Sequence, residues 1–454
     1  EALHSLNEAL TLSRSTEERM ELEGELIAVD ISQGHFEAAR RRCLNAIERF
    51  NDPTNRAGLG IFYNALGIVY FYQNKFDEAT QYFTRARALL EPGGPKDKLI
   101  SNYLNLGNVF SAQDNFTEAE RHWQRALVLS KEIGNVQQEA QIYNNLGISS
   151  YKSARYDDAL HYYQQALEVF TRIGNLPGKA FCLTNTGEVH FTQSEYQKAL
   201  ACWRESLKLY QLLQDNQGLA ETHNQLAQID ILLEDLEPAR HHLDIAAEIT
   251  EHEAIESQRG LCYLLSGSVA ILEGNFKRAE ELLAAAKAFF KSVKDEKGYL
   301  LSLLKFGEVA RLGFQPRLAR EFFEEVLQVS SQCNLPLSRA EALLQLALEA
   351  RSGGSGRQQK PFLYLREAFG LLQHEVVCET TWKVCYYLGK EYLGRGLDAR
   401  GKEFLRHAQK VLEFLSSSFT EEELRRKFLA SQRRGEILNE INLLCMNSVH
   451  GRQN

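Results

Sequence analysis

Apolar residues recur along this chain in paired helical stretches separated by short polar turns. Tyr143, Leu146, Gly147 and Ser150 follow an i, i+3, i+4, i+7 pattern, which predicts one face of a helix. After the polar segment 152–155, a second apolar series with helical spacing runs over residues 156–170. Each such pair of stretches predicts two antiparallel helices joined by a short turn.

The pair of helical stretches repeats along the chain every 40 residues. A small residue occupies one position of each first helix: Gly67, Gly107, Gly147, Gly187, Ala227, Gly267, Gly307 and Ala347. Two columns of mainly alanine begin at Ala39 and Ala46 in the second helices and keep the same spacing. Small side chains let two helices approach closely, so we expect these columns at the helix crossings.

This repeat predicts an all-α fold, a right-handed α-solenoid of stacked antiparallel helix pairs. One helix pair cannot bury its apolar face alone, whereas stacked pairs bury a continuous core. The 44% of hydrophobic residues suffices for a long core, and 8 prolines in 454 residues fit a helical chain. Glycine after a second helix, as at Gly134 and Gly174, is expected to end that helix in a left-handed conformation.

The register divides the chain into four parts. We predict the second helix of a truncated repeat (1–20), eight repeats (21–338), two degenerate repeats (339–415) with a Gly/Ser interruption (351–360), and C-terminal capping helices (416–454). Thr420 and Glu423 predict a capping box at the start of one capping helix. Because the helix that should precede residues 1–13 is missing, we interpret the chain as a piece of a longer protein.

The repeated residues resemble the tetratricopeptide repeat. With Gly147 as the small residue of the first helix, the family's aromatic, leucine and alanine positions are matched by Tyr143, Leu146, Ala159, Tyr163 and Ala166. The usual period is about 34 residues. The longer period here is similar to the variant found in bacterial multidomain signalling proteins and some eukaryotic adaptors. The resemblance covers residues 1–415 and implies a module that binds proteins or peptides.

Motifs for catalysis and cofactor binding are missing from the sequence. It has no phosphate-binding G-x-x-x-x-G-K-[ST], no G-x-G-x-x-G after a strand, no H-E-x-x-H and no G-x-S-x-G. We therefore predict no catalytic residues, no cofactor and no enzyme activity in these residues. The eight cysteines form no C-x-x-C pair, which favours free thiols in a reducing, cytoplasmic compartment over disulfides or metal ligands. The adjacent His241 and His242 are expected on the surface rather than in a metal site.

The charge and hydropathy of the chain exclude two classes of partner. A net charge of −8 lacks the basic surface that nucleic acid requires. No apolar stretch approaches the roughly 20 residues of a membrane span. We therefore expect a protein or peptide partner, whereas the oligomeric state is left open.

Polar side chains recur at one position on the opposite face of the first helices. Two residues before the small column stand Asn105, Asn145, Asn185 and Gln225, and the same face continues with Asn108, Lys152, Glu188 and Gln228. In the family this face lines the concave groove. Asparagine is a mediocre helix former, so its recurrence suggests amides that hydrogen-bond the backbone of a bound peptide. The alternative, a solvated helix face, stays open.

We therefore predict an interaction module that serves as the sensor or scaffold of a larger signalling protein. The segment 419–431 resembles the end of such arrays in large bacterial regulators. One alternative is a cytosolic receptor for a small signalling peptide. Another is the regulatory region of an enzyme whose NTPase, kinase or protease domain lies outside these residues.

Overall fold

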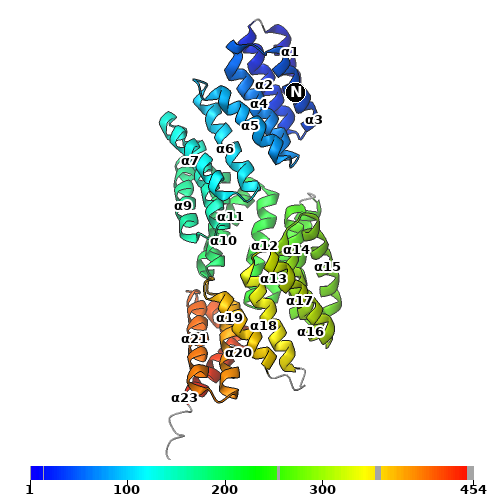
Figure 1. Cartoon of the computed structure of the whole chain (residues 1–454), viewed down its shortest axis with the longest axis vertical. Helices are drawn as coiled ribbons and strands as arrows, with labels where there is room; N and C mark the ends of the chain where they lie inside the picture. Colours follow the sequence, from blue (N-terminus) through cyan, green and yellow to red (C-terminus); the bar gives the residue numbers. More distant parts are fainter. Residues whose placement is uncertain (1, 14, 253–255, 353–358, 447–454) are drawn as a thin grey trace, which may run out of the picture. The chain divides into compact units, whose positions relative to one another are not determined.

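The chain folds as an all-α solenoid of stacked antiparallel helix pairs (Figure 1). The computed structural model describes residues 2–13, 15–252, 256–352 and 359–446, and every regular element in these ranges is helical. Most of the predicted Gly/Ser interruption (353–358) and the last predicted capping residues (447–454) lie outside the described residues. The chain separates into two compact units, Glu1–Cys182 and Leu183–Asn454, here called unit 1 and unit 2.

Unit 1 contains successive pairs of first and second helices. Its elements are α1 (Ala2–Leu12), α2 (Thr16–Ser32), α3 (Phe36–Arg49), η1 (Pro53–Asn55), α4 (Arg56–Tyr72), α5 (Phe76–Leu90), α6 (Lys96–Ala112), α7 (Phe116–Ile133), α8 (Val136–Lys152) and α9 (Tyr156–Arg172). The next first helix, α10 (Leu176–Thr192), contains the boundary between the units. The domain boundary predicted after residue 20 falls inside α2.

Unit 2 continues the same alternation and ends in shorter helices. Its elements are α11 (Tyr196–Leu213), α12 (Asn216–Leu232), α13 (Leu236–His252), α14 (Glu256–Leu272), α15 (Phe276–Ser292), α16 (Glu296–Leu312), α17 (Pro316–Gln332), α18 (Pro336–Ser352), α19 (Gln359–Leu372), α20 (Glu379–Gly394), α21 (Asp398–Ser417), α22 (Glu422–Ala430), η2 (Ser431–Arg433) and α23 (Arg434–Met446). The predicted capping box is wrong, because Glu421 is the N-cap of α22 and no side chain caps the helix.

The glycines of the repeat column give space to an aromatic ring of the second helix. A Cβ atom on Gly107 would lie 2.2 Å from Nε1 of Trp123, and one on Gly147 would lie 2.5 Å from Cε1 of Tyr163. The Trp123 indole N–H donates to the Leu104 carbonyl at 3.2 Å, which holds the ring over Gly107. The prediction that the small residue lets two backbones approach is therefore wrong at Gly107 and Gly147, because a ring of the second helix fills the space.

Glycines end two of the second helices as the sequence predicts. Gly134 and Gly174 have φ values of 68° and 69°, in the left-handed region that favours glycine. After Gly134, the Asn135 side chain accepts from the Gln138 N–H at 3.1 Å and caps the next first helix. Consecutive pairs are therefore joined by short turns that leave the first helices of neighbouring repeats parallel.

The two ends of unit 2 share one hydrophobic core. Trp203 of α11 and Leu226 of α12 belong to the same buried cluster as Leu412 of α21, Phe428 of α22 and Ile441 of α23. The stacked rings of Tyr196 and Phe419 have centroids 5.5 Å apart. The C-terminal helices thus cover early helices of unit 2 as well as the last helix pair, which the sequence pattern does not indicate.

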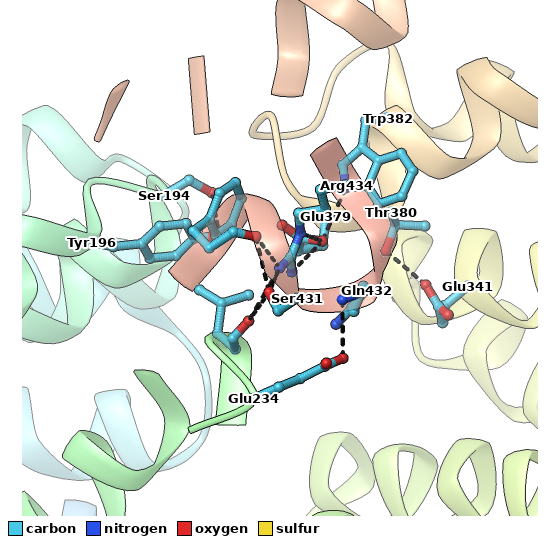
Figure 2. Close-up of polar contacts among 12 residues, drawn as sticks. Ser194, Tyr196, Glu234, Glu341, Glu379, Thr380, Trp382, Ser431, Gln432 and Arg434 are labelled. Carbon is cyan, nitrogen blue, oxygen red and sulfur yellow. Dashed lines mark hydrogen bonds and ion pairs between the residues drawn. The ribbon is translucent and has the colours of Figure 1, made fainter. Parts of the chain in front are cut away.

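Polar contacts hold this closure, and we call residues 418–434 with their partners the C-terminal clasp (Figure 2). Arg434, whose side chain is fully buried, donates to the carbonyls of Leu232 at 3.3 Å and Phe428 at 3.0 Å. Its guanidinium also pairs with the Glu379 carboxylate at 3.0 Å, and this carboxylate accepts from the Trp382 indole N–H at 2.9 Å. One arginine therefore joins α12, α20 and α22.

Further contacts of the C-terminal clasp reach two inter-helix turns. Lys427 forms an ion pair with Asp235. The Gln432 N–H donates to the Glu234 carboxylate at 3.2 Å (Figure 2). Gln432 and Arg433 have φ values of 49° and 56°, an uncommon conformation for side chains other than glycine. This turn directs the Arg434 side chain into the protein interior.

A buried carboxyl beside the clasp makes the stability of unit 2 depend on pH. Burial, together with the negative charge of Asp235, raises the pKa of Asp230 to about 7, although the positive charges of Lys427 and Arg204 oppose the shift. Nε2 of His242 lies 3.9 Å from Asp230 Oδ2, which has no hydrogen-bond partner among the described residues. The native carboxyl thus holds its proton to a higher pH than an unfolded one, whose pKa is about 3.9.

We expect this carboxyl to lower the stability of unit 2 as the pH rises from about 4 to about 7, because unfolding then releases the proton that the native state retains. Asp230→Asn should unfold at a higher denaturant concentration than the parent at pH 8 and at nearly the same concentration at pH 4. Chemical denaturation at both values measures this. The lowered pKa values of His223 and His242 make stability rise with pH instead, but both histidines are present in the parent and in the variant, so the comparison between the two is unaffected. Equal transitions at pH 8 would contradict the assignment.

Candidate functional site

The first helices of unit 1 line an open groove of about 1190 Å³, which we call the N-terminal groove. Its walls come mainly from α2, α4 and α6. A Cβ atom on Gly58 would meet Met20, and one on Gly24 would lie 3.9 Å from Ile61, so α2 and α4 run parallel along it. Small residues, including Gly24 and the exposed Ala28, keep the space between the walls open.

One end of the N-terminal groove is acidic. Glu17, Glu21 and Glu25 line it from successive turns of α2, and all three side chains are exposed. Within the described part of the chain, none of these carboxylates forms an ion pair. Lys98 of α6 is a cation in the lining, but its ammonium lies 3.4 Å from the Asp97 carboxylate.

The other end of the groove is apolar and aromatic. It is lined by Ile31 at the end of α2 and by Ile68, Phe71 and Tyr72 at the end of α4. Tyr72 is 58% exposed, although its ring stacks on that of Phe36 at 5.3 Å. An exposed aromatic residue beside a groove suits the anchoring of an apolar side chain.

Two of the predicted amide residues, Asn105 and Asn108, line this groove from α6. The Asn105 amide donates to Asn64 of α4 at 3.4 Å, and the buried Asn102 donates to the same Asn64 oxygen at 2.9 Å. The amides of neighbouring repeats therefore bind one another across the first helices. The half-buried Asn105 and Asn108 still border the groove, so the predicted contact with a ligand backbone stays a prediction.

Asn145 lies in a smaller pocket of about 350 Å³ in unit 1. Its amide donates to Asn108 at 3.3 Å, which extends the contacts between repeats to α8. Phe181, which is 42% exposed, lines the same pocket. Lys152 is exposed at the end of α8 and lines neither of the two pockets.

The remaining predicted site residues belong to unit 2. Asn185 and Glu188 are half-buried on α10, and Gln228 is half-buried on α12. Gln225 is buried, and its Oε1 has no hydrogen-bond partner among the described residues. Burial raises the pKa of Glu221 to about 7, and the negative charge of Glu188 adds to this effect. The first two of these residues thus lie on α10 and the last two on α12.

No group of three or more potential metal ligands occurs in the described ranges. His242 is not the surface residue that we predicted, because its side chain is only 22% exposed and its Nδ1 lies 2.7 Å from Nδ1 of His223. All eight cysteines are free thiols. Burial raises the pKa of the Cys43 and Cys182 thiols to about 12, so these two are unreactive near neutral pH.

Sequence profiles of the tetratricopeptide repeat match the chain from residue 62 of unit 1 into the start of unit 2. The matches cover residues 62–91, 99–172 and 138–211. The paired helices, the glycine column and the 40-residue step extend the same pattern beyond these ranges. Residues 62–91 and 99–211 therefore contain tetratricopeptide repeats.

Solved structures share the fold of this chain at low sequence identity. Aspartyl phosphate phosphatase F from Bacillus subtilis is 13% identical, with 64% of this chain and 75% of that chain covered and a TM-score of 0.54. The apo form of RapI is 14% identical, with 61% and 98% covered and a TM-score of 0.50. A comparison with curated protein sequences gives no match. These likenesses establish the fold alone.

Most of the residues that line the N-terminal groove were not predicted from the sequence. Glu17, Glu21 and Glu25 recur every fourth residue, a spacing that marks one face of a helix, but the predicted boundary after residue 20 divided them. Asn64 lies one position before the predicted amide column.

Among the described residues, no helix is long and apolar enough to cross a membrane.

Proposed function

We propose that this protein binds a protein or peptide segment in the N-terminal groove. The observation that carries this proposal is the open space of about 1190 Å³ along three successive first helices. Small-molecule sites usually measure about 300–1,000 Å³ and enclose their ligand. An open groove with separate acidic, apolar and amide regions is better suited to the side chains of an extended partner.

The proposed role is that of a sensor or scaffold in a larger signalling protein. The repeats offer a surface on which partner segments can dock through hydrogen bonds, ion pairs and apolar contacts. Asn105, Asn108 and Asn145 would contribute amide groups to this recognition from unit 1. A receptor for a small signalling peptide would use the same groove. The free thiols favour a reducing, cytoplasmic location.

Filling the groove tests the proposal. Ala28 is small, exposed and part of the groove lining, so Ala28→Trp should block the space without disturbing a buried contact. Peptides selected from a random display library on the intact protein should bind Ala28→Trp at least roughly tenfold more weakly, which corresponds to about 1.4 kcal/mol. Fluorescence anisotropy measures the affinities.

The matched control places the same side chain outside the groove. Ala288 is exposed on the second helix α15, so Ala288→Trp should leave the peptide affinities unchanged. Circular dichroism should show the parent's helical content in both variants. If the selected peptides bound both variants as tightly as the parent, the N-terminal groove would not be the binding site.

A further inference from the structure

We infer that the N-terminal groove takes a segment that is basic at one end and apolar at the other, with its basic end beside the first turns of α2. This inference rests on the proposed function and adds the chemistry of the partner. The two ends of the groove differ in charge and hydropathy, so they select both the composition and the direction of the segment.

The spacing of the acidic residues sets the spacing of the basic side chains. Four residues of an α-helix rise about 6 Å, so Glu17, Glu21 and Glu25 present carboxylates at steps of about that length. In an extended peptide, side chains on one face recur about 6.6–6.8 Å apart, and in a helical one every fourth residue matches the same step. A segment with three basic residues at either spacing can pair with all three carboxylates.

The electrostatics of the lining disfavour an acidic segment. A bound segment displaces water from the carboxylates, and like charges brought together there lose solvation without gaining an ion pair. Lys98 does not reverse this preference, because Asp97 lies beside its ammonium. Since the carboxylates are exposed, the attraction should weaken as salt concentration rises.

The apolar end supplies the anchor. Tyr72, Phe71, Ile68 and Ile31 lie where α2 and α4 end, about 21 Å along α2 from Glu17 to Ile31. A leucine or aromatic side chain that follows the basic residues would cover the exposed face of Tyr72. Burying apolar surface contributes roughly 25 cal/mol per Å², so this contact holds the segment at salt concentrations that screen the charges.

Designed peptides serve as probes. Two fluorescein-labelled peptides carry three lysines followed by leucine and phenylalanine, one with lysines at alternate positions and one with lysines at every fourth position. Each has a twin with glutamate in place of lysine. At low salt, at least one lysine peptide should bind the intact protein more than tenfold tighter than its glutamate twin. Fluorescence anisotropy over a salt series measures the affinities.

Two triple variants distinguish the effect of the groove carboxylates on binding from the effect of the protein's net charge. Glu17→Gln, Glu21→Gln and Glu25→Gln together should weaken the lysine peptide about tenfold and flatten its salt dependence. The control combines Glu48→Gln, Glu78→Gln and Glu168→Gln, three exposed glutamates on second helices, which change the net charge equally outside the groove. That control should keep the parent's affinity within about twofold.

The outcomes distinguish this inference from the proposed function. If library-selected peptides lose affinity on Ala28→Trp but are acidic, or are unaffected by the triple Glu17/Glu21/Glu25 variant, the groove binds peptides and the basic assignment is overturned. A glutamate twin that binds as tightly as its lysine peptide overturns it too. If lysine peptides bind equally to the parent and Ala28→Trp, the groove is not their site and the basic assignment is overturned. The proposed function fails as well only if the library-selected peptides are also unaffected by Ala28→Trp.

Discussion

Arg434→Met is expected to lower the local stability of unit 2 by about 3–5 kcal/mol, because removing one partner of a buried ion pair leaves the other charge without compensation. The variant leaves the Glu379 carboxylate, whose side chain is 20% exposed, without its guanidinium partner. It also removes a donor from the carbonyls of Leu232 and Phe428. Hydrogen exchange should show faster opening of α22, α23 and the turn after α12, with unit 1 unchanged.

The neighbouring arginine provides the control for this variant. Arg433 is 80% exposed and pairs with Glu436 on the surface, so Arg433→Met should change stability by no more than about 0.5 kcal/mol. Arg434→Lys should recover little of the loss, because an ammonium cannot reproduce the planar set of guanidinium donors. Equal exchange rates in Arg434→Met and Arg433→Met would show that the apolar core alone closes unit 2.

Gly147→Ala is expected to lower the stability of unit 1 by about 1–3 kcal/mol, although alanine is normally the better helix former. The added Cβ would lie 2.5 Å from Cε1 of Tyr163, and that ring is buried and only 2% exposed. The ring must therefore move within a packed core. Chemical denaturation of the variant, followed by circular dichroism, measures the loss.

Alanine at a second glycine of the same unit is expected to have the opposite effect on stability. A Cβ on Gly24 would lie 3.9 Å from Ile61, an ordinary contact distance, so Gly24→Ala should keep or raise stability by up to about 1 kcal/mol. The difference between the two variants isolates the ring contact from helix propensity. A Gly147→Ala variant as stable as Gly24→Ala would mean that the Tyr163 ring can leave its position over Gly147 without loss.

These predictions distinguish residues that stabilise the fold from residues that are expected to bind a partner. The glycine column fixes the packing within each helix pair, and the C-terminal clasp fixes the ends of unit 2. The N-terminal groove is expected to contribute neither to the packing within helix pairs nor to the closure of unit 2. Its three glutamates and Tyr72 are exposed, and substitutions of these residues are expected to change binding rather than stability.

The sequence by itself determined the all-α class, the helix pairs and their register. This was possible because the interactions within a helix pair are local and recur. Gly147 and Tyr163 lie on neighbouring helices joined by a short turn, and the same contact forms between Gly107 and Trp123. Helix ends followed for the same reason, since Gly134 and Asn135 act on their immediate neighbours. Because the same local pattern recurs, each repeat supports the helix assignment of the others.

The candidate site was only partly accessible to the same reasoning. Asn105 and Asn108 were found because they follow the repeat, and they line the N-terminal groove. Glu17 and Tyr72 do not recur at the same position of the other repeats, so the columns of the repeat do not include them. The hydrogen bonds from Asn105 to Asn64 and from Asn145 to Asn108 also depend on which side chains neighbouring first helices bring together.

Only the tertiary structure decided how unit 2 ends. The contacts of Arg434 with Leu232 and of Lys427 with Asp235 join residues about 200 positions apart, and no periodic pattern relates them. They form because small rotations between successive helix pairs accumulate through the solenoid until its last helices meet earlier ones. The register of one repeat fixes its own packing, but the sum of these rotations, and therefore the closure, is a property of the folded chain as a whole.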